Sequence, residues 1–169
     1  MTAKKSDSKQ SRRSPVEIGL SAEACETSRD GLVRVLADQH VLYLKTRNFH
    51  WNLIGPRFSS LHGFFERLYQ ELEKSIDETA ERIRMLGEAS PGSMAEFLER
   101  ATIKEVAGGR IKGEDAIAKL RDDHEQVIRN LREVVEKTGE AGDAGTEDFL
   151  TGLLRSHEHA AWMLRSYLT

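Results

Sequence analysis

Two histidines and one glutamate near the middle of the chain are spaced for shared metal binding. His50 precedes a break at Gly55-Pro56 and His62 follows it, so two antiparallel helices joined here would place the imidazoles opposite each other. Glu66 comes four residues after His62 and shares its helix face. Imidazole and carboxylate ligands suit iron, manganese or zinc, and open coordination positions would permit redox chemistry.

A second acidic pair, Asp77 and Glu81, lies further along the same predicted helix. Glu81 follows His62 by 19 residues, which corresponds to roughly 28 Å at about 1.5 Å per helical residue. One straight helix therefore cannot bring both groups to one metal ion. Two subunits with antiparallel helices about a two-fold axis would place one group against the other and create two equal sites. The spacing thus predicts an oligomer with metal sites at a subunit interface.

These side chains also have simpler interpretations. An acidic pair spaced by four residues is commonly a solvated helix face, and a single histidine is commonly a hydrogen-bonded structural residue. We interpret the remaining histidines as structural: His40, His124, His157 and His159. No histidine follows a glutamate by three residues, as a di-iron site inside one bundle usually requires. The interface site is therefore the better metal hypothesis, and a helical interaction protein without iron is its competitor.

The elements that must position these residues are long helices. Apolar residues recur every three or four positions over about 21–53, 59–86, 113–137 and 146–167, which predicts four helices. Gly87 is expected to end the second helix, and Thr146 to cap the fourth. The connection between the second and third helices holds a short predicted helix at 94–100 and is long enough to cross the bundle. This pattern is typical of an all-α, ferritin-like four-helix bundle.

Composition indicates a soluble protein with an uneven charge. The chain is 38% hydrophobic and 31% charged, and no apolar run approaches the roughly 18 residues that span a membrane. A single cysteine, Cys25, interpreted as a small apolar core residue, and the lack of a secretory signal predict a cytoplasmic location. Residues 1–15 carry a balance of +4, which leaves −7 on the rest. We therefore expect a disordered basic arm at 1–15 and one domain over 16–169.

The stretch from Lys45 to Gly87 closely resembles the Dps family, the DNA-binding proteins of starved cells. The matching segments follow the family's order and spacing: Phe49-His50-Trp51-Asn52, Gly55-Pro56, Leu61-His62, Phe65-Glu66, Asp77 and Ala80-Glu81-Arg82-Ile83. The helical outline extends the resemblance over roughly residues 22–168. The resemblance implies a dodecameric hollow shell that oxidises Fe²⁺, preferably with hydrogen peroxide, stores ferric mineral and protects DNA from oxidative damage.

The resemblance also implies roles for individual residues. The ferroxidase centre would lie between two-fold-related subunits, with one group of ligands from each: His50, His62 and Glu66 from one, Asp77 and Glu81 from the other. Many relatives have Asp where this chain has Glu66, so the position or affinity of iron can differ. Trp51 would donate an electron if a radical escapes, although simple packing explains a tryptophan there equally well.

Acidic residues line the iron-entry pores at the three-fold axis of related shells. Asp143, Glu147 and Asp148 stand near the start of the fourth predicted helix, where such residues are expected, and Asp148 is the preferred candidate. Glu147 and Asp148 are equally well explained as favourable charges at a helix N-terminus.

Lysine-rich tails in the family often bind DNA. The basic residues of the arm are the candidates here: Lys4, Lys5, Lys9, Arg12 and Arg13. Many arms on one shell would bind through multivalency, contacting phosphates without reading sequence. The alternative function is therefore a nucleoid-compacting, DNA-binding shell with secondary metal chemistry, and a solubilising tail is the simpler interpretation of the arm.

Overall fold

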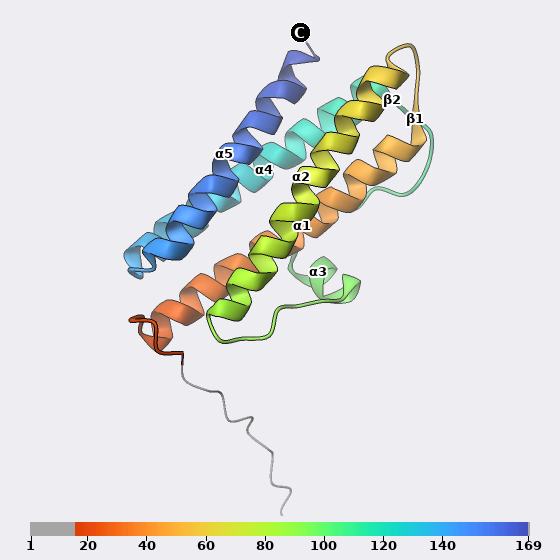
Figure 1. Cartoon of the computed structure of the whole chain (residues 1–169). Coiled ribbons are helices and arrows are strands. Elements are labelled where there is room, and N and C mark those ends of the chain that lie inside the picture. The colour runs from red at the N-terminus through yellow and green to blue at the C-terminus, as the bar shows by residue number, and fades with distance from the viewer. Residues whose placement is uncertain (1–15, 169) are drawn as a thin grey trace, which may run out of the picture.

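Four long helices run side by side in the computed structural model, which describes residues 16–168 (Figure 1). They are α1 (Ala22–Asn52), α2 (Phe58–Met85), α4 (Gly113–Glu140) and α5 (Ala144–Ser166). The short helix α3 (Met94–Arg100) lies in the connection between α2 and α4. This confirms the predicted four-helix bundle with a short extra helix in its long connection. The predicted arm at 1–15 lies outside the described residues.

The hairpin between α1 and α2 is the part of the fold that sets up the predicted metal site. The Ser21 hydroxyl caps the start of α1 by accepting a hydrogen bond from the amide of Ala24 at 3.1 Å. After α1, the chain passes through the short strand β1 (Leu53–Ile54) and turns at Gly55, whose φ of +119° favours glycine. The amide of Phe58 then donates to the Gly55 carbonyl at 3.1 Å, and α2 begins.

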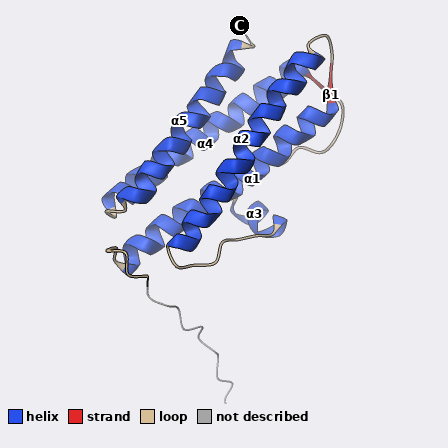
Figure 2. Ribbon diagram, viewed as in Figure 1, coloured by secondary structure: helices blue, strands red, loops and turns tan. Residues whose placement is uncertain are grey.

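The long connection crosses from the far end of α2 to the hairpin end, where β2 (Ile111–Lys112) pairs in parallel with β1 (Figure 2). Ser93 and Glu96 form a capping box at the start of α3. The buried carboxylate of Asp38 on α1 accepts hydrogen bonds from the amide of Thr102 at 2.6 Å and from Asn130 Nδ2 at 2.9 Å. These bonds fasten the connection to both α1 and α4.

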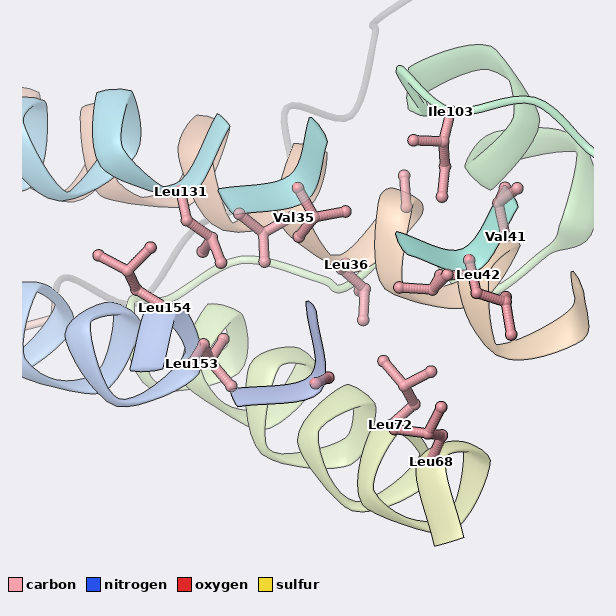
Figure 3. Close-up of a cluster of buried hydrophobic side chains, with 14 of the residues drawn as sticks. Val35, Leu36, Val41, Leu42, Leu68, Leu72, Ile103, Leu131, Leu153 and Leu154 are labelled. Carbon is pink, nitrogen blue, oxygen red and sulfur yellow. The ribbon is translucent and has the colours of Figure 1, made fainter. Parts of the chain in front are cut away.

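The core fills the space between the long helices with aliphatic side chains (Figure 3). Leu36 and Leu42 of α1 and Leu131 of α4 are fully buried there. Cys25 is also buried and belongs to the same core, as the sequence predicts. Among the described residues, no helix is both long enough and apolar enough to cross a membrane.

The prediction that Thr146 caps the last helix is wrong, because Asp143 takes that role. The Asp143 carboxylate accepts hydrogen bonds from the amide of Thr146 at 3.0 Å and from Arg82 at 3.0 Å. Thr146 is instead fully buried inside α5. Gly142, with φ of +78°, lets the chain turn directly before the cap, so the helix begins two residues earlier than expected.

Candidate metal centre

The hairpin brings His50 and His62 together, as their spacing predicts. Their rings stack with centroids 3.7 Å apart and planes inclined by 19°. His50 Nδ1 lies 2.9 Å from the His62 carbonyl oxygen, and His62 Nδ1 lies 3.0 Å from the His50 carbonyl oxygen. Each ring is therefore oriented by the backbone of the other. His50 also stands in the last turn of α1, where carbonyl groups lack helical partners. The hydrogen bond from His62 therefore gives one of these carbonyl groups a partner.

These reciprocal hydrogen bonds determine which ring nitrogen is free. A carbonyl oxygen only accepts hydrogen bonds, so Nδ1 must carry the proton in each ring. A neutral imidazole carries one proton, which leaves the lone pair of Nε2 available on both histidines. A backbone carbonyl holding one nitrogen while the other faces a metal is the usual environment of a histidine ligand. The pair is thus built as two oriented nitrogen donors.

Glu66 and Tyr69 extend the cluster along α2. Glu66 is partly buried, and the Tyr69 hydroxyl lies 3.5 Å from its Oε1. The Tyr69 ring also meets His50 edge to face, with 5.3 Å between centroids. Desolvation and the neighbouring Glu66 carboxylate raise the pKa of Tyr69, so the phenol stays protonated and remains a donor. Tyr69 was not among the residues predicted from the sequence, although its position three residues after Glu66 places it on the same helix face.

Aromatic and apolar side chains surround this cluster on the surface. Trp51 is 58% exposed, and Phe58 and Ile54 are 45% and 43% exposed. Phe58 stacks on His62 with 5.0 Å between centroids, and the Arg47 guanidinium lies 5.0 Å from the centre of the Trp51 ring. Packing inside the subunit therefore does not explain Trp51. A group of exposed large apolar residues on one surface indicates a contact surface, and this group lies beside the two histidines.

Asp77 and Glu81 are exposed near the other end of α2. The structure records no hydrogen bond or ion pair between either carboxylate and another described residue, whereas Glu78 between them pairs with Lys74 at 3.7 Å. Within residues 16–168, no group of three or more histidine, cysteine or acidic side chains is close enough to hold a metal ion. The two groups of predicted ligands therefore lie apart within the described chain, toward opposite ends of α2.

The three predicted pore residues occupy different environments. Asp143 is only 2% exposed, and its carboxylate is engaged by Thr146 and Arg82 within the subunit. Burial alone would raise the pKa of Asp143, but the hydrogen bonds from Thr146 hold it below its ordinary value. Glu147 is partly buried and Asp148 is exposed. Of the three, Asp148 is the carboxylate that remains most accessible.

His124 and His157 are buried between α4 and α5, in agreement with their structural interpretation. Their Nδ1 atoms lie 3.0 Å apart, so one ring donates a hydrogen bond to the other. Burial lowers the pKa of His124 well below its ordinary value and that of His157 to about 4. His159, two residues further along α5, is exposed, as the helical geometry predicts.

This buried pair predicts that acid destabilises the bundle. An unfolded histidine titrates near pH 6.5, so above that value neither state of His157 binds a proton and stability is constant. Between about pH 6.5 and pH 4 the unfolded chain binds a proton that the folded chain refuses, and stability falls by roughly 3 kcal/mol for His157. We expect His157→Gln to make this part of the profile shallower in urea unfolding at pH 7 and pH 5, while buried His124 keeps its own share of the fall. His159→Gln is the matched control and should leave the profile as it is.

Comparisons with known proteins show that this architecture is ferritin-like. Residues 29–169 match the ferritin-like domain family. The crystal structure of a Dps protein from Vibrio cholerae, described as a ferritin-like diiron-carboxylate protein, superposes with a TM-score of 0.86 at 35% identity, over 90% of this chain and 96% of that one.

Proteins related in sequence indicate which ferritin-like family the chain belongs to. The DNA protection during starvation protein 2 of Bacillus anthracis is 39% identical over 81% of this chain and 93% of its own length. A low temperature-induced protein of Nostoc is 47% identical over 90% of this chain and 86% of its own length. The chain belongs to the Dps family of ferritin-like proteins.

Proposed function

We propose that this protein oxidises Fe²⁺ and stores the ferric product inside a hollow shell of identical subunits. His50, His62 and Glu66 of one subunit bind the iron substrate together with Asp77 and Glu81 of the partner subunit. The observation that carries the proposal is the reciprocal hydrogen bonding of His50 and His62, which orients two nitrogen donors at an exposed apolar surface. Two oriented donors cannot complete a metal site alone, and we infer that the acidic pair on α2 of the partner subunit supplies the missing ligands.

The ligand types suit the oxidation of iron. Neutral imidazole nitrogens bind Fe²⁺, and carboxylates bind both Fe²⁺ and the harder Fe³⁺ product. Two Fe²⁺ ions supply the two electrons that reduce one hydrogen peroxide, with two protons, to two water molecules. Because both electrons leave together, no hydroxyl radical is released. Tyr69 meets His50 edge to face, and Trp51 follows His50 in the chain, so these are the side chains that would supply an electron if only one iron reacted.

The assembled shell is the second part of the proposal. Twelve chains of 19.1 kDa would form a particle of about 229 kDa with closed symmetry. Asp148, and beside it Glu147, would admit cations at a pore, while Asp143 holds the start of α5 in place. We place the particle in the cytoplasm, and zinc or manganese would compete with iron for the same ligands.

The experiment that tests this function measures ferric absorbance after Fe²⁺ and peroxide are added to particles sized in solution. We expect an oxidation rate well above that of free iron, faster with peroxide than with oxygen, from a particle of about twelve chains. A monomer or small dimer that oxidises iron no faster than buffer would refute the proposal.

The basic arm supports DNA binding as a second function, through Lys4, Lys5, Lys9, Arg12 and Arg13. We expect full-length protein to retard DNA in a gel at low salt and to release it steeply as salt rises. A form lacking residues 1–15 should lose most of this retardation, because the rest of the chain carries a net charge of −7. Equal retardation by both forms would exclude the arm as the binding element.

A further inference from the structure

A guanidinium group lies among three aromatic rings beside the proposed ferroxidase ligands. The Cζ atom of Arg47 on α1 is 5.0 Å from the centre of the Trp51 ring, 5.2 Å from that of Tyr69 and 5.5 Å from that of Tyr43. Arg47 Nη1 also donates a hydrogen bond to the Tyr43 hydroxyl at 2.6 Å. A cation within about 6 Å of a ring centre is attracted to the ring, so Arg47 holds these aromatic side chains together.

The rings form a continuous series of contacts that ends at an iron ligand of the proposed site. The Tyr43 and Tyr69 rings meet edge to face with 6.2 Å between centroids, and Tyr69 meets His50 in the same way at 5.3 Å. Electron transfer between aromatic groups weakens steeply with distance, so rings in direct contact are the favoured carriers. An electron can therefore pass from Tyr43 through Tyr69 to iron bound at His50.

Tyr43 differs from Tyr69 in what surrounds its hydroxyl group. A tyrosine that loses an electron also loses its phenolic proton, so a nearby base favours the neutral radical. The Tyr43 hydroxyl donates to Glu73 Oε1 at 3.4 Å while it accepts the hydrogen bond from Arg47. The Glu73 side chain is exposed and is not one of the proposed iron ligands, so it is free to take a proton. The carboxylate beside Tyr69 belongs to Glu66, which would be bound to iron.

Trp51 is less suited than Tyr43 to remain oxidised. A tryptophan ring that loses an electron carries a positive charge until its indole proton leaves. The Arg47 charge 5.0 Å away opposes that positive charge. A neutral Tyr43 radical meets no such opposition and keeps the hydrogen bond from Arg47 to its oxygen. Oxidation that begins at Tyr69 or Trp51 should therefore end at Tyr43.

We propose that Tyr43 is the terminal electron donor of the ferroxidase centre and that Glu73 accepts its proton, an inference that rests on the proposed iron oxidation. When a single Fe²⁺ meets one hydrogen peroxide, the iron supplies one electron and Tyr69 supplies the second. Tyr43 then gives an electron to Tyr69, which ends with its electron and proton restored, and the proton of Tyr43 passes to Glu73. Two protons from solvent complete two water molecules. The products are Fe³⁺, water, protonated Glu73 and a neutral Tyr43 radical, so no hydroxyl radical is released.

The test adds fewer Fe²⁺ ions than centres to the full-length protein without oxygen, then adds hydrogen peroxide and freezes the sample at once. We expect the electron paramagnetic resonance signal of a tyrosyl radical, which narrows when the protein is made with ring-deuterated tyrosine. Tyr43→Phe should abolish this signal, Glu73→Gln should lower its yield, and Tyr167→Phe, the control at the end of α5, should retain it. The same signal in the Tyr43→Phe protein, or a tryptophan radical as the stable species in the unmodified protein, overturns the proposal. An unchanged yield in the Glu73→Gln protein overturns the role of Glu73.

The unmodified protein gives a second measurement that requires no variant to fold. High-field spectra report hydrogen bonds to the oxygen of a tyrosyl radical, and we expect to detect the one that Arg47 donates to Tyr43. A radical whose oxygen accepts no hydrogen bond overturns the proposal. Ferric absorbance in the same samples separates the two claims. Iron that is oxidised without a tyrosyl radical contradicts only the role of Tyr43, whereas iron that is not oxidised refutes the proposed function and this inference with it.

Discussion

Replacing Asp77 by Asn and Glu81 by Gln is expected to lower the initial rate of Fe²⁺ oxidation by about 100-fold or more. The amides keep the shape of the carboxylates but lose the charge that binds iron. Because both side chains are exposed and have no recorded partner within the described chain, stability should change little. Stopped-flow absorbance of the ferric product measures the rate, and the thermal midpoint measures stability.

Glu78→Gln is the matched control for this experiment. Glu78 lies between the two residues on the same exposed stretch of α2, and its one ion pair within residues 16–168 is with Lys74. We therefore expect the oxidation rate to stay within about twofold. An unchanged rate in the Asp77→Asn/Glu81→Gln protein would remove the acidic pair from the centre. An equal loss in Glu78→Gln would indicate a general effect of negative charge instead.

Removing the carboxylate of Asp123 is expected to destabilise the bundle by about 3–5 kcal/mol. Asp123 on α4 contacts Lys45 Nζ at 2.5 Å, and the Lys45 side chain is only 5% exposed. Burial raises the pKa of Asp123 even though the lysine opposes that shift. Asp123→Ala would leave the lysine charge buried without a counterion, next to the turn of α1 that carries His50. Urea unfolding at pH 7 measures the loss.

A double variant separates the cost of an unpaired charge from the value of the pair. Lys45→Met combined with Asp123→Leu removes both charges and fills the space, so it should recover most of the stability lost in Asp123→Ala. Asp122→Ala is the exposed control, because that carboxylate pairs with the neighbouring Arg121 at the surface, and it should cost about 0.5 kcal/mol or less. A cost below about 1 kcal/mol for Asp123→Ala would contradict this account.

The helices and the histidine hairpin were predictable because both depend on local spacing. Apolar periodicity and the breaks at Gly55 and Gly87 determine where α1 and α2 run, and an antiparallel hairpin must then bring His50 near His62. The reciprocal hydrogen bonds to backbone carbonyls were not predictable, since they depend on the exact crossing of the two helices. The orientation of each Nε2 is therefore information that only the structure supplies.

Two further features of the structure could not be predicted from the sequence, because they are contacts between segments far apart in the chain. Asp143 caps α5 and contacts Arg82, which is 61 residues away on α2. The meeting of His124 and His157 joins residues 33 apart. Neither pairing has a periodic signal in the sequence, because each is set by how α5 packs on the rest of the bundle.

The most direct test of the shared site mixes two inactive subunits. One variant carries His62→Ala and Glu66→Gln, and the other carries Asp77→Asn and Glu81→Gln, so each forms only defective sites by itself. In a random equal mixture, a site is intact when the Asp77→Asn/Glu81→Gln subunit supplies its histidines and the His62→Ala/Glu66→Gln subunit supplies its acids. This combination occurs in about one quarter of sites. We predict that co-assembled particles recover about 25% of the unmodified oxidation rate. Recovery no greater than the sum of the two separate variants would contradict a centre built from two subunits.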